Sequence, residues 1–316
     1  MSRRYAWLRR TIDLWTRQEI HSQIEAVVVR PEALARETII AEDLRPFHSL
    51  QIVDVPELDS VGTGFAAGVR QARAPVVMLA EDHAFPEPGL AETILGAYDD
   101  PNVVAAGPVM FNGNPKTLAS ETAFVLAFSA VAYARSTREA RSLGGHNASY
   151  RRNFLMSFGD ELAEWYKSER VLQFEIEARK RKMILLAHPR IAHFNFSRWR
   201  STIVHAFHGG RLFGGQRCRD WRLGRRAAYA LGAPLVPFIR LRRVMADLRE
   251  SPDEYARFVP RRLPILAFVL SLHALGEAVG YALGVGHAVD HYAPFELYRR
   301  DQLITREREE IESFNF

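Results

Sequence analysis

Three consecutive polar residues, Glu81, Asp82 and His83, follow a short apolar run at residues 76–80. The run is rich in β-branched residues, which favours a strand buried on both faces, as in a parallel sheet. Open α/β sheets bind ligands beyond the carboxyl ends of their strands. Carboxylate and imidazole groups placed there can bind a divalent metal ion. The alternative is that the three residues are solvated and begin a turn, since loops commonly carry acidic residues.

Prolines follow these residues closely. Pro86 stands three residues after His83, and Pro88-Gly89 comes next. Proline has no amide proton to donate to a strand ladder, so it is rare inside sheets. We therefore expect the strand to stop at the polar residues and no further strand to follow directly.

A second polar segment covers residues 144–152. It begins with Gly144 and Gly145, which let the backbone approach a ligand closely. The side chains after them offer hydrogen-bond donors, acceptors and planar cations. These side chains belong to His146, Asn147, Ser149, Arg151 and Arg152. The segment is therefore a candidate ligand-binding loop.

Strands and helices are predicted to alternate along the first two thirds of the chain. The predicted strands are 24–29, 51–55, 76–80, 103–109 and 183–186. The predicted helices are 4–23, 62–74, 89–98 and 169–181, and residues 118–138 are predicted to form one helix or paired helices. This alternation predicts an α/β fold with a mainly parallel central sheet flanked by helices.

Glycines 62, 64 and 68 open one of these helices. They superficially suggest a dinucleotide-binding loop, but their spacing is not G-x-G-x-x-G and no suitable acid follows. The interpretation that we prefer is close packing of a helix on the sheet.

Composition limits the class of protein. The chain has 316 residues, of which 47% are hydrophobic, so it can bury a large core with or without an appendage. Its single cysteine, Cys218, excludes an internal disulfide and fits a reducing compartment. The first residues lack the apolar stretch of a secretory signal. We therefore expect a cytoplasmic protein.

The order of these features resembles the family 2 nucleotide-sugar glycosyltransferases, which have a GT-A fold. In that family an apolar strand ends in a D-x-D motif that precedes a proline and P-G. Glu81-Asp82-His83 stands at that place, with Pro86 and Pro88-Gly89 behind it. The family then shows G-x-N-x-x-x-R-R, which is matched by residues 145–152.

The resemblance continues downstream and covers roughly residues 5 to 210. Glu169 stands before a helix at the position of the family's acid, and Pro189 and His193 follow the next strand. No glycine follows Arg179 in the way that the family's R-x-x-x-G pattern requires.

The resemblance implies an inverting, single-displacement sugar transfer that depends on a divalent metal, Mn or Mg. Glu81 and His83 take the two D positions, and His193 is expected to be a further metal ligand or to contact the diphosphate. A histidine in the outer position suits Mn²⁺ or Zn²⁺ better than Mg²⁺. A lone histidine at a strand end is otherwise usually structural. Glu169 is the candidate general base, and Asp160 or the neighbouring Glu161 is the alternative.

Other binding roles follow from the same resemblance. Arg30, together with residues 81–83, is expected to bind the donor, and Gly145, His146 and Asn147 to bind the acceptor. The family opens with an apolar strand that helps to bind the nucleotide base, whereas this chain begins at the following helix. Either the true start lies upstream or the nucleotide site is rebuilt. A catalytically silent GT-A-like binding or scaffold protein is therefore the alternative.

Residues 211–316 are predicted to form a helical carboxyl-terminal region beside a glycosyltransferase domain at 1–210. Arginines and aromatic residues interleave between residues 194 and 226. This pattern suits single-stranded nucleic acid, anionic lipid or a solvated helical face. Residues 264–288 are long and apolar enough to span a membrane, but His273 and Glu277 favour a packed hairpin or an interfacial helix.

We therefore expect peripheral contact with the inner membrane face and no nucleic-acid partner. The expected partners are a nucleotide-sugar donor and an acceptor that is a lipid-linked saccharide or another envelope glycan.

Overall fold

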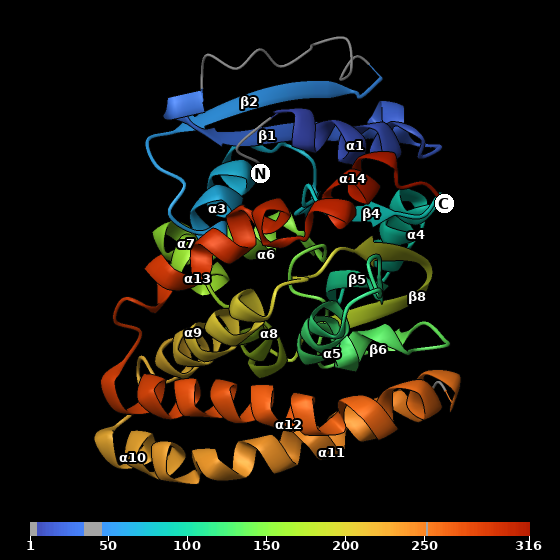
Figure 1. Cartoon of the computed structure of the whole chain (residues 1–316). Coiled ribbons are helices and arrows are strands. Elements are labelled where there is room, and N and C mark those ends of the chain that lie inside the picture. Colours follow the sequence, from blue (N-terminus) through green and yellow to red (C-terminus); the bar gives the residue numbers. More distant parts are fainter. Residues whose placement is uncertain (1–4, 35–45, 251) are drawn as a thin grey trace. The chain divides into compact units, whose positions relative to one another are not determined.

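The computed structural model describes residues 5–34, 46–250 and 252–316 (Figure 1). Residue Arg4, where the first helix was expected to begin, lies outside the described residues. The chain forms two compact units, each built from separate segments. Unit 1 contains Met1–Phe111, Ser136–Phe194 and Arg306–Phe316, and unit 2 contains Asn112–Arg135 and Asn195–Thr305. The predicted division at residue 210 stays a prediction.

Unit 1 begins with a small parallel sheet. Strands β1 (Glu25–Pro31) and β2 (Ser49–Val55) pair in parallel, from Glu25 opposite Ser49 to Pro31 opposite Val55. Helix α1 (Tyr5–Thr16) contributes Leu8 and Ile12 to an apolar cluster with Phe47. This cluster removes the apolar face of α1 from water.

The second sheet of unit 1 has six strands in the order β3-β7-β5-β8-β4, with β6 paired to β8. Its strands are β3 (Val76–Met78), β4 (Ala84–Pro86), β5 (Val103–Asn112), β6 (Arg138–Glu139), β7 (Ser149–Arg151) and β8 (Lys182–His193). An α/β fold with a central sheet flanked by helices is thereby confirmed.

Among the strand pairs with a described register, only β1 and β2 have the expected parallel arrangement. The pairs β3–β7, β5–β7, β4–β8 and β6–β8 are all antiparallel. The sequence did not predict these antiparallel pairs because each includes a strand of two or three residues, and so short a strand shows no periodicity in the sequence. Strand β7 lies inside the predicted ligand loop 144–152.

The expectation that no strand follows residues 81–83 is wrong. Strand β4 begins at Ala84 and includes Pro86. It lies at the edge of the sheet, beside β8 alone. Proline is tolerated there because one side of an edge strand needs no amide donor.

Helices complete unit 1. They are α3 (Val61–Gln71), α4 (Leu90–Gly96), α6 (Arg152–Met156), α7 (Leu162–Tyr166), α8 (Glu169–Ala178) and most of α14 (Thr305–Ser313). The side-chain oxygen of Ser60 accepts from the amide of Thr63 and caps α3. A Cβ on Gly62 would stand 2.3 Å from the carbonyl oxygen of Ala163, so this glycine allows α3 to pack against α7.

Unit 2 is helical. Its helices are α5 (Leu118–Ala132), α9 (Trp199–Arg217), α10 (Leu223–Gly232), α11 (Val236–Leu248), α12 (Pro252–Leu283) and α13 (Ala288–Leu297). Helices α9 and α12 approach closely at glycines: a Cβ on Gly210 would stand 2.1 Å from the carbonyl oxygen of His273. A Cβ on Gly276 would stand 2.0 Å from that of Phe207. Larger residues would force these two helices apart.

Candidate active site

Two histidines far apart in the sequence meet because β4 pairs with β8. In the antiparallel register Ala84 lies opposite His193. The amide of Phe194 donates to the carbonyl oxygen of His83 at 3.0 Å. The two imidazole rings are edge to face, with centroids 4.9 Å apart and an interplanar angle of 78°. The strand that the sequence did not predict therefore positions both side chains.

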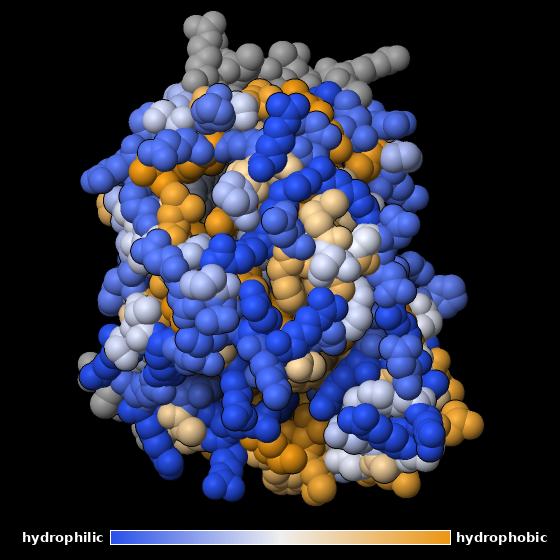
Figure 2. Space-filling model, turned by 180° about the vertical axis from the view of Figure 1, so that it is seen from behind, coloured by the Kyte–Doolittle hydropathy of each residue, from blue (hydrophilic) through white to orange (hydrophobic). Residues whose placement is uncertain are grey.

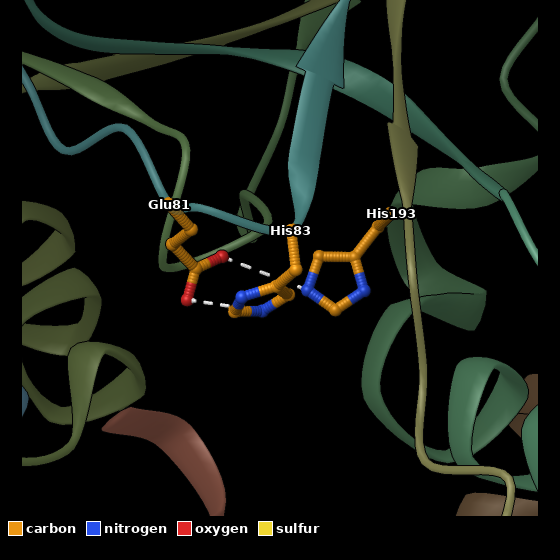
Figure 3. A group of neighbouring side chains, drawn as sticks. All are labelled: Glu81, His83 and His193. Carbon is orange, nitrogen blue, oxygen red and sulfur yellow. Dashed lines mark ion pairs between the residues drawn. The ribbon is translucent and has the colours of Figure 1, made fainter. Parts of the chain in front are cut away.

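The carboxylate of Glu81 faces both rings (Figure 3). Its Oε1 lies 3.6 Å from Nε2 of His83, and its Oε2 lies 3.6 Å from Nε2 of His193. The amide of Asn147 donates to Oε2 at 2.6 Å, and the hydroxyl of Thr11 donates to the Glu81 backbone carbonyl at 3.1 Å. Both the side chain and the backbone of Glu81 are thus held in place.

The geometry of Glu81, His83 and His193 fits a divalent metal ion. One ligand atom from each lies within 4.8 Å of the others, and all three residues are buried. Ligands about 2.1 Å from a tetrahedral ion are about 3.4 Å from one another, close to the separations found here. Within the described part of the chain, Nε2 of His83 is buried and makes no hydrogen bond. A buried imidazole nitrogen without a hydrogen bond is costly unless a ligand occupies it.

Asp82 orients one of these rings. Its Oδ1 lies 2.9 Å from Nδ1 of His83. A carboxylate on one ring nitrogen fixes the tautomer and directs the other nitrogen outward, as in many carboxylate–histidine–metal arrangements. Asp82 thereby makes Nε2 of His83 available for a metal ion.

His146 links two carboxylates. Its Nδ1 lies 2.9 Å from Oε1 of Glu81, and its Nε2 contacts Oε1 of Glu169. Glu169 is the first residue of α8. Gly145 permits this approach, because a Cβ there would stand 2.7 Å from Cβ of Glu169. The hydroxyl of Tyr166 donates to the carbonyl of Gly145 at 3.0 Å and fixes this loop.

The charges of this cluster shift two pKa values. Burial alone raises the pKa of Glu81, but the charges of His83 and His146 and hydrogen bonds from His146 and His193 lower it well below the usual range. Burial alone lowers the pKa of His146, but the carboxylates of Glu169 and Glu81 raise it well above the usual range. Glu81 is therefore a carboxylate at neutral pH, as a metal ligand must be.

The structure brings most of the predicted site residues together. Glu81, Asp82, His83, His146, Asn147, Glu169 and His193 are connected by the contacts described above. Gly145 joins them through its close approach to Glu169. The described contacts of His146 and Asn147 are with carboxylates, and their predicted role in acceptor binding stays a prediction.

Two predicted residues lie elsewhere in unit 1. Arg30 is on β1, and its Nε donates to Oδ1 of Asp54 on β2 at 2.6 Å. Asp160 is exposed in the short 3-10 helix Gly159–Glu161, where its carbonyl oxygen accepts from Arg70 at 3.5 Å. Their assigned roles stay predictions.

Two contributors were missed in the sequence. Thr11 supports Glu81 from α1, and Tyr166 supports Gly145 while its ring stacks on His146 with centroids 6.3 Å apart. Helix α1 would be amphipathic with or without Thr11, so its sequence does not indicate that this threonine supports the site. Tyr166 adjoins Trp165 in a short apolar segment that is typical of a core.

Comparisons with known proteins concern the fold. No protein-family model and no curated protein matches the chain. Among solved structures, it is similar to a mannosyltransferase from Pyrobaculum calidifontis in complex with GDP-Man and Mn²⁺, with a TM-score of 0.56 and 12% identity. That match covers 90% of this chain and 85% of the mannosyltransferase.

TarS of S. aureus matches more distantly. The complex with UDP has a TM-score of 0.44 and 14% identity and covers 88% of each chain. The complex with UDP-GlcNAc has a TM-score of 0.42 and 13% identity, covering 95% of this chain and 90% of TarS. The similarity to the mannosyltransferase, which is the stronger of the two, confirms the GT-A-like fold.

Proposed function

We propose that this protein transfers a sugar from a nucleotide-sugar donor and requires a divalent metal ion. The observation that carries the proposal is the convergence of Glu81, His83 and His193 in a GT-A-like fold. The mannosyltransferase of similar fold was solved with a nucleotide sugar and Mn²⁺. In this role the metal ion neutralises charge on the diphosphate leaving group.

The ligand set favours manganese over magnesium. Two of the three proposed ligands are imidazoles, and Mg²⁺ prefers oxygen ligands and bound waters. The donor diphosphate would supply further oxygen ligands to the metal ion, beside the carboxylate of Glu81. We therefore expect Mn²⁺ to support donor binding better than Mg²⁺.

Glu169 is the proposed general base. The acceptor hydroxyl oxygen attacks the anomeric carbon on the face opposite the diphosphate, and the bond from that carbon to the diphosphate oxygen breaks. Its electron pair leaves with the diphosphate, while the acceptor proton passes to a carboxylate oxygen. His146 contacts Oε1 of Glu169, so we assign the proton to Oε2. Such a single displacement inverts the anomeric configuration, as in the family 2 enzymes.

His146 has a positioning role in this scheme. It joins the metal-side carboxylate of Glu81 to the base Glu169. Rotation of Glu169 would break its contact with His146, so the imidazole holds the base relative to the metal ligands.

The acceptor that we propose is a lipid-linked saccharide or another envelope glycan.

A donor panel tests the proposal. Full-length protein is titrated with GDP-mannose, UDP-GlcNAc and related donors by calorimetry, with and without Mn²⁺. We expect at least one donor to bind in the presence of Mn²⁺ and to raise the melting temperature. Absence of donor binding under every condition would contradict the proposal.

The base assignment needs a separate comparison. Glu169→Gln keeps the shape of the side chain and should lower the turnover rate by about a hundredfold or more while donor binding persists. Asp160→Asn is the matched control at the alternative base and should change neither quantity. If Asp160→Asn lowers the turnover rate and Glu169→Gln does not, the base would be Asp160. Donor binding with no transfer by the wild-type protein to any acceptor would favour the silent binding protein.

A further inference from the structure

Large apolar side chains are exposed on three neighbouring helices of unit 2. On α10 and the turn that follows it, the exposed fractions are 80% for Leu223, 82% for Leu231 and 62% for Leu235. On α11 the exposed fraction of Phe238 is 72%. Figure 2 shows hydrophobic residues gathered in the lower part of the view, where these helices lie. A cluster of this kind usually marks an interaction surface.

These exposed positions follow the helical repeat. Leu223 and Leu231 are eight residues apart on α10, and the spacing of Leu235, Phe238 and Ile239 places them on one side of the chain that leads into α11. Helix α12 adds Phe268, Leu275 and Leu283, which are also exposed. We call these eight residues the apolar face.

The opposite side of α12 is occupied by α9. Gly276 and Gly280 approach carbonyl oxygens of α9, and Glu277 is buried. The segment Arg262–Leu283 is long and apolar enough to span a membrane. Its packing on α9 and its buried carboxylate favour a helix that lies along a membrane surface over one that crosses it.

Positive charge surrounds the apolar face. The segment from residue 217 to residue 249 contains nine arginines and two aspartates. Arg222 and Arg225 on the α10 side are exposed, and so are Arg242 and Arg243 on α11. Arginine places its aliphatic stem along apolar surface and its guanidinium in the headgroup layer. An anionic lipid surface complements both the apolar and the charged residues.

Other partners fit these residues less well. Single-stranded nucleic acid is bound by aromatic platforms on which bases stack, whereas five of the eight residues of the apolar face are leucines. A second copy of the chain would bring two arginine-rich surfaces together. We propose that the apolar face of α10, α11 and α12 binds peripherally to an anionic lipid bilayer. This proposal is independent of the sugar transfer proposed above.

Vesicle flotation tests this surface. Full-length protein is mixed with vesicles of phosphatidylcholine alone or of phosphatidylcholine with phosphatidylglycerol. We expect binding to the anionic vesicles that weakens with added salt and is released by alkaline carbonate. No binding to anionic vesicles would overturn the proposal, and resistance to carbonate would replace it with a membrane-spanning helix.

Matched variants locate the contact. Leu231→Glu with Phe238→Glu should lower partition into anionic vesicles by roughly tenfold or more, because two large apolar side chains leave the interface. Leu95→Glu is the control, since Leu95 lies on α4 in unit 1 and is 44% exposed. Equal losses in both variants would overturn the assignment of the surface.

A second variant guards against misfolding of the first. Arg242→Gln with Arg243→Gln changes exposed side chains and should lower partition roughly tenfold or more at low salt. A single-stranded oligonucleotide is then added to the vesicle-bound protein. If it releases the protein from the vesicles, the surface would be assigned to nucleic acid. A dimer in sedimentation that Phe238→Glu dissociates would assign it to a second copy. Either result overturns the lipid proposal.

Discussion

Glu81 in unit 1 and Glu277 in unit 2 are both buried glutamates beside histidines, but their surroundings differ. Glu81 receives contacts from His83 in the turn before β4, from His193 at the end of β8 and from Asn147 in the loop before β7. Glu277 contacts His273 at 3.1 Å and Tyr281 at 3.3 Å, four residues before and after it on α12. The first carboxylate gathers groups from distant segments, whereas the second contacts its own helix.

The two histidines that pair with these carboxylates also differ. The pKa of His146 is raised, because two carboxylates outweigh the cost of burial. The pKa of His273 is lowered, because burial and the charge of Arg240 outweigh the single carboxylate of Glu277. A buried histidine–glutamate pair is therefore not in itself a site. Convergence from several elements onto one carboxylate distinguishes the proposed site.

The largest expected effect separates the two glutamates directly. Glu81→Gln removes a charged ligand and should reduce Mn²⁺ affinity by about a hundredfold or more, as measured by calorimetry. Glu277→Gln removes an equally buried charge in unit 2 and should leave Mn²⁺ affinity unchanged. Similar losses in both variants would show that convergence is no guide to metal binding.

The second effect concerns the close helix packing of unit 2. Gly276→Ala places a Cβ 2.0 Å from the carbonyl oxygen of Phe207. The helices must separate, which should lower the free energy of unfolding by about 1 to 3 kcal/mol in urea titrations.

Gly232→Ala is the control for that measurement, because no atom lies within 4 Å of the added Cβ. It should leave stability unchanged or raise it slightly. Mn²⁺ affinity should be normal in both glycine variants. Reduced Mn²⁺ affinity in Gly276→Ala would mean that the metal site depends on the packing of α9 and α12.

A smaller effect is expected from the residue that orients His83. Asp82→Asn keeps a hydrogen-bond acceptor but removes its charge, so the ring loses part of its orientation. Mn²⁺ affinity should fall by roughly tenfold, which is the lower end for residues behind metal ligands. An unchanged affinity would remove Asp82 from the proposed site.

The smallest effect is a pH dependence in unit 2. The lowered pKa of His273 means that the unfolded chain, with a value near 6.5, binds this proton more readily than the folded chain. The full stability of the fold is therefore present above about pH 6.5, where His273 is neutral in both states. Part of it is lost as the pH falls through the lowered pKa of the folded state. His273→Gln should therefore lessen the fall in melting temperature between about pH 7 and pH 5. An unaltered pH profile would contradict the lowered pKa.

Local patterns predicted the regular elements of unit 1 better than the sheet that joins them. The alternation of strand and helix predicted β1, β2, β3 and β5 to within a few residues of their observed bounds. It did not predict β4 or β7, because three-residue strands show no period and Pro86 argued against one. Their antiparallel direction was missed with them.

The candidate site shows the same limit. The order of Glu81, the segment 145–152 and His193 suggested one site, and the structure brings these residues together. Which atoms meet could not be predicted. The register that sets Ala84 opposite His193 joins segments more than a hundred residues apart, and no local pattern encodes it. The contacts of His146 with two carboxylates were not predicted, and its expected role in acceptor binding stays a prediction.

Phe314 covers aromatic residues beside the candidate site. Phe314 packs against Phe85 and Phe194, with ring centroids 5.4 Å from each, and its carbonyl oxygen accepts from Arg10. Phe85 lies on β4 two residues after His83, and Phe194 directly follows His193 at the end of β8. Removal of residues 314–316 would uncover these two rings and take away the contact with Arg10. We therefore expect a chain shortened by these residues to lose Mn²⁺ affinity, as measured by calorimetry.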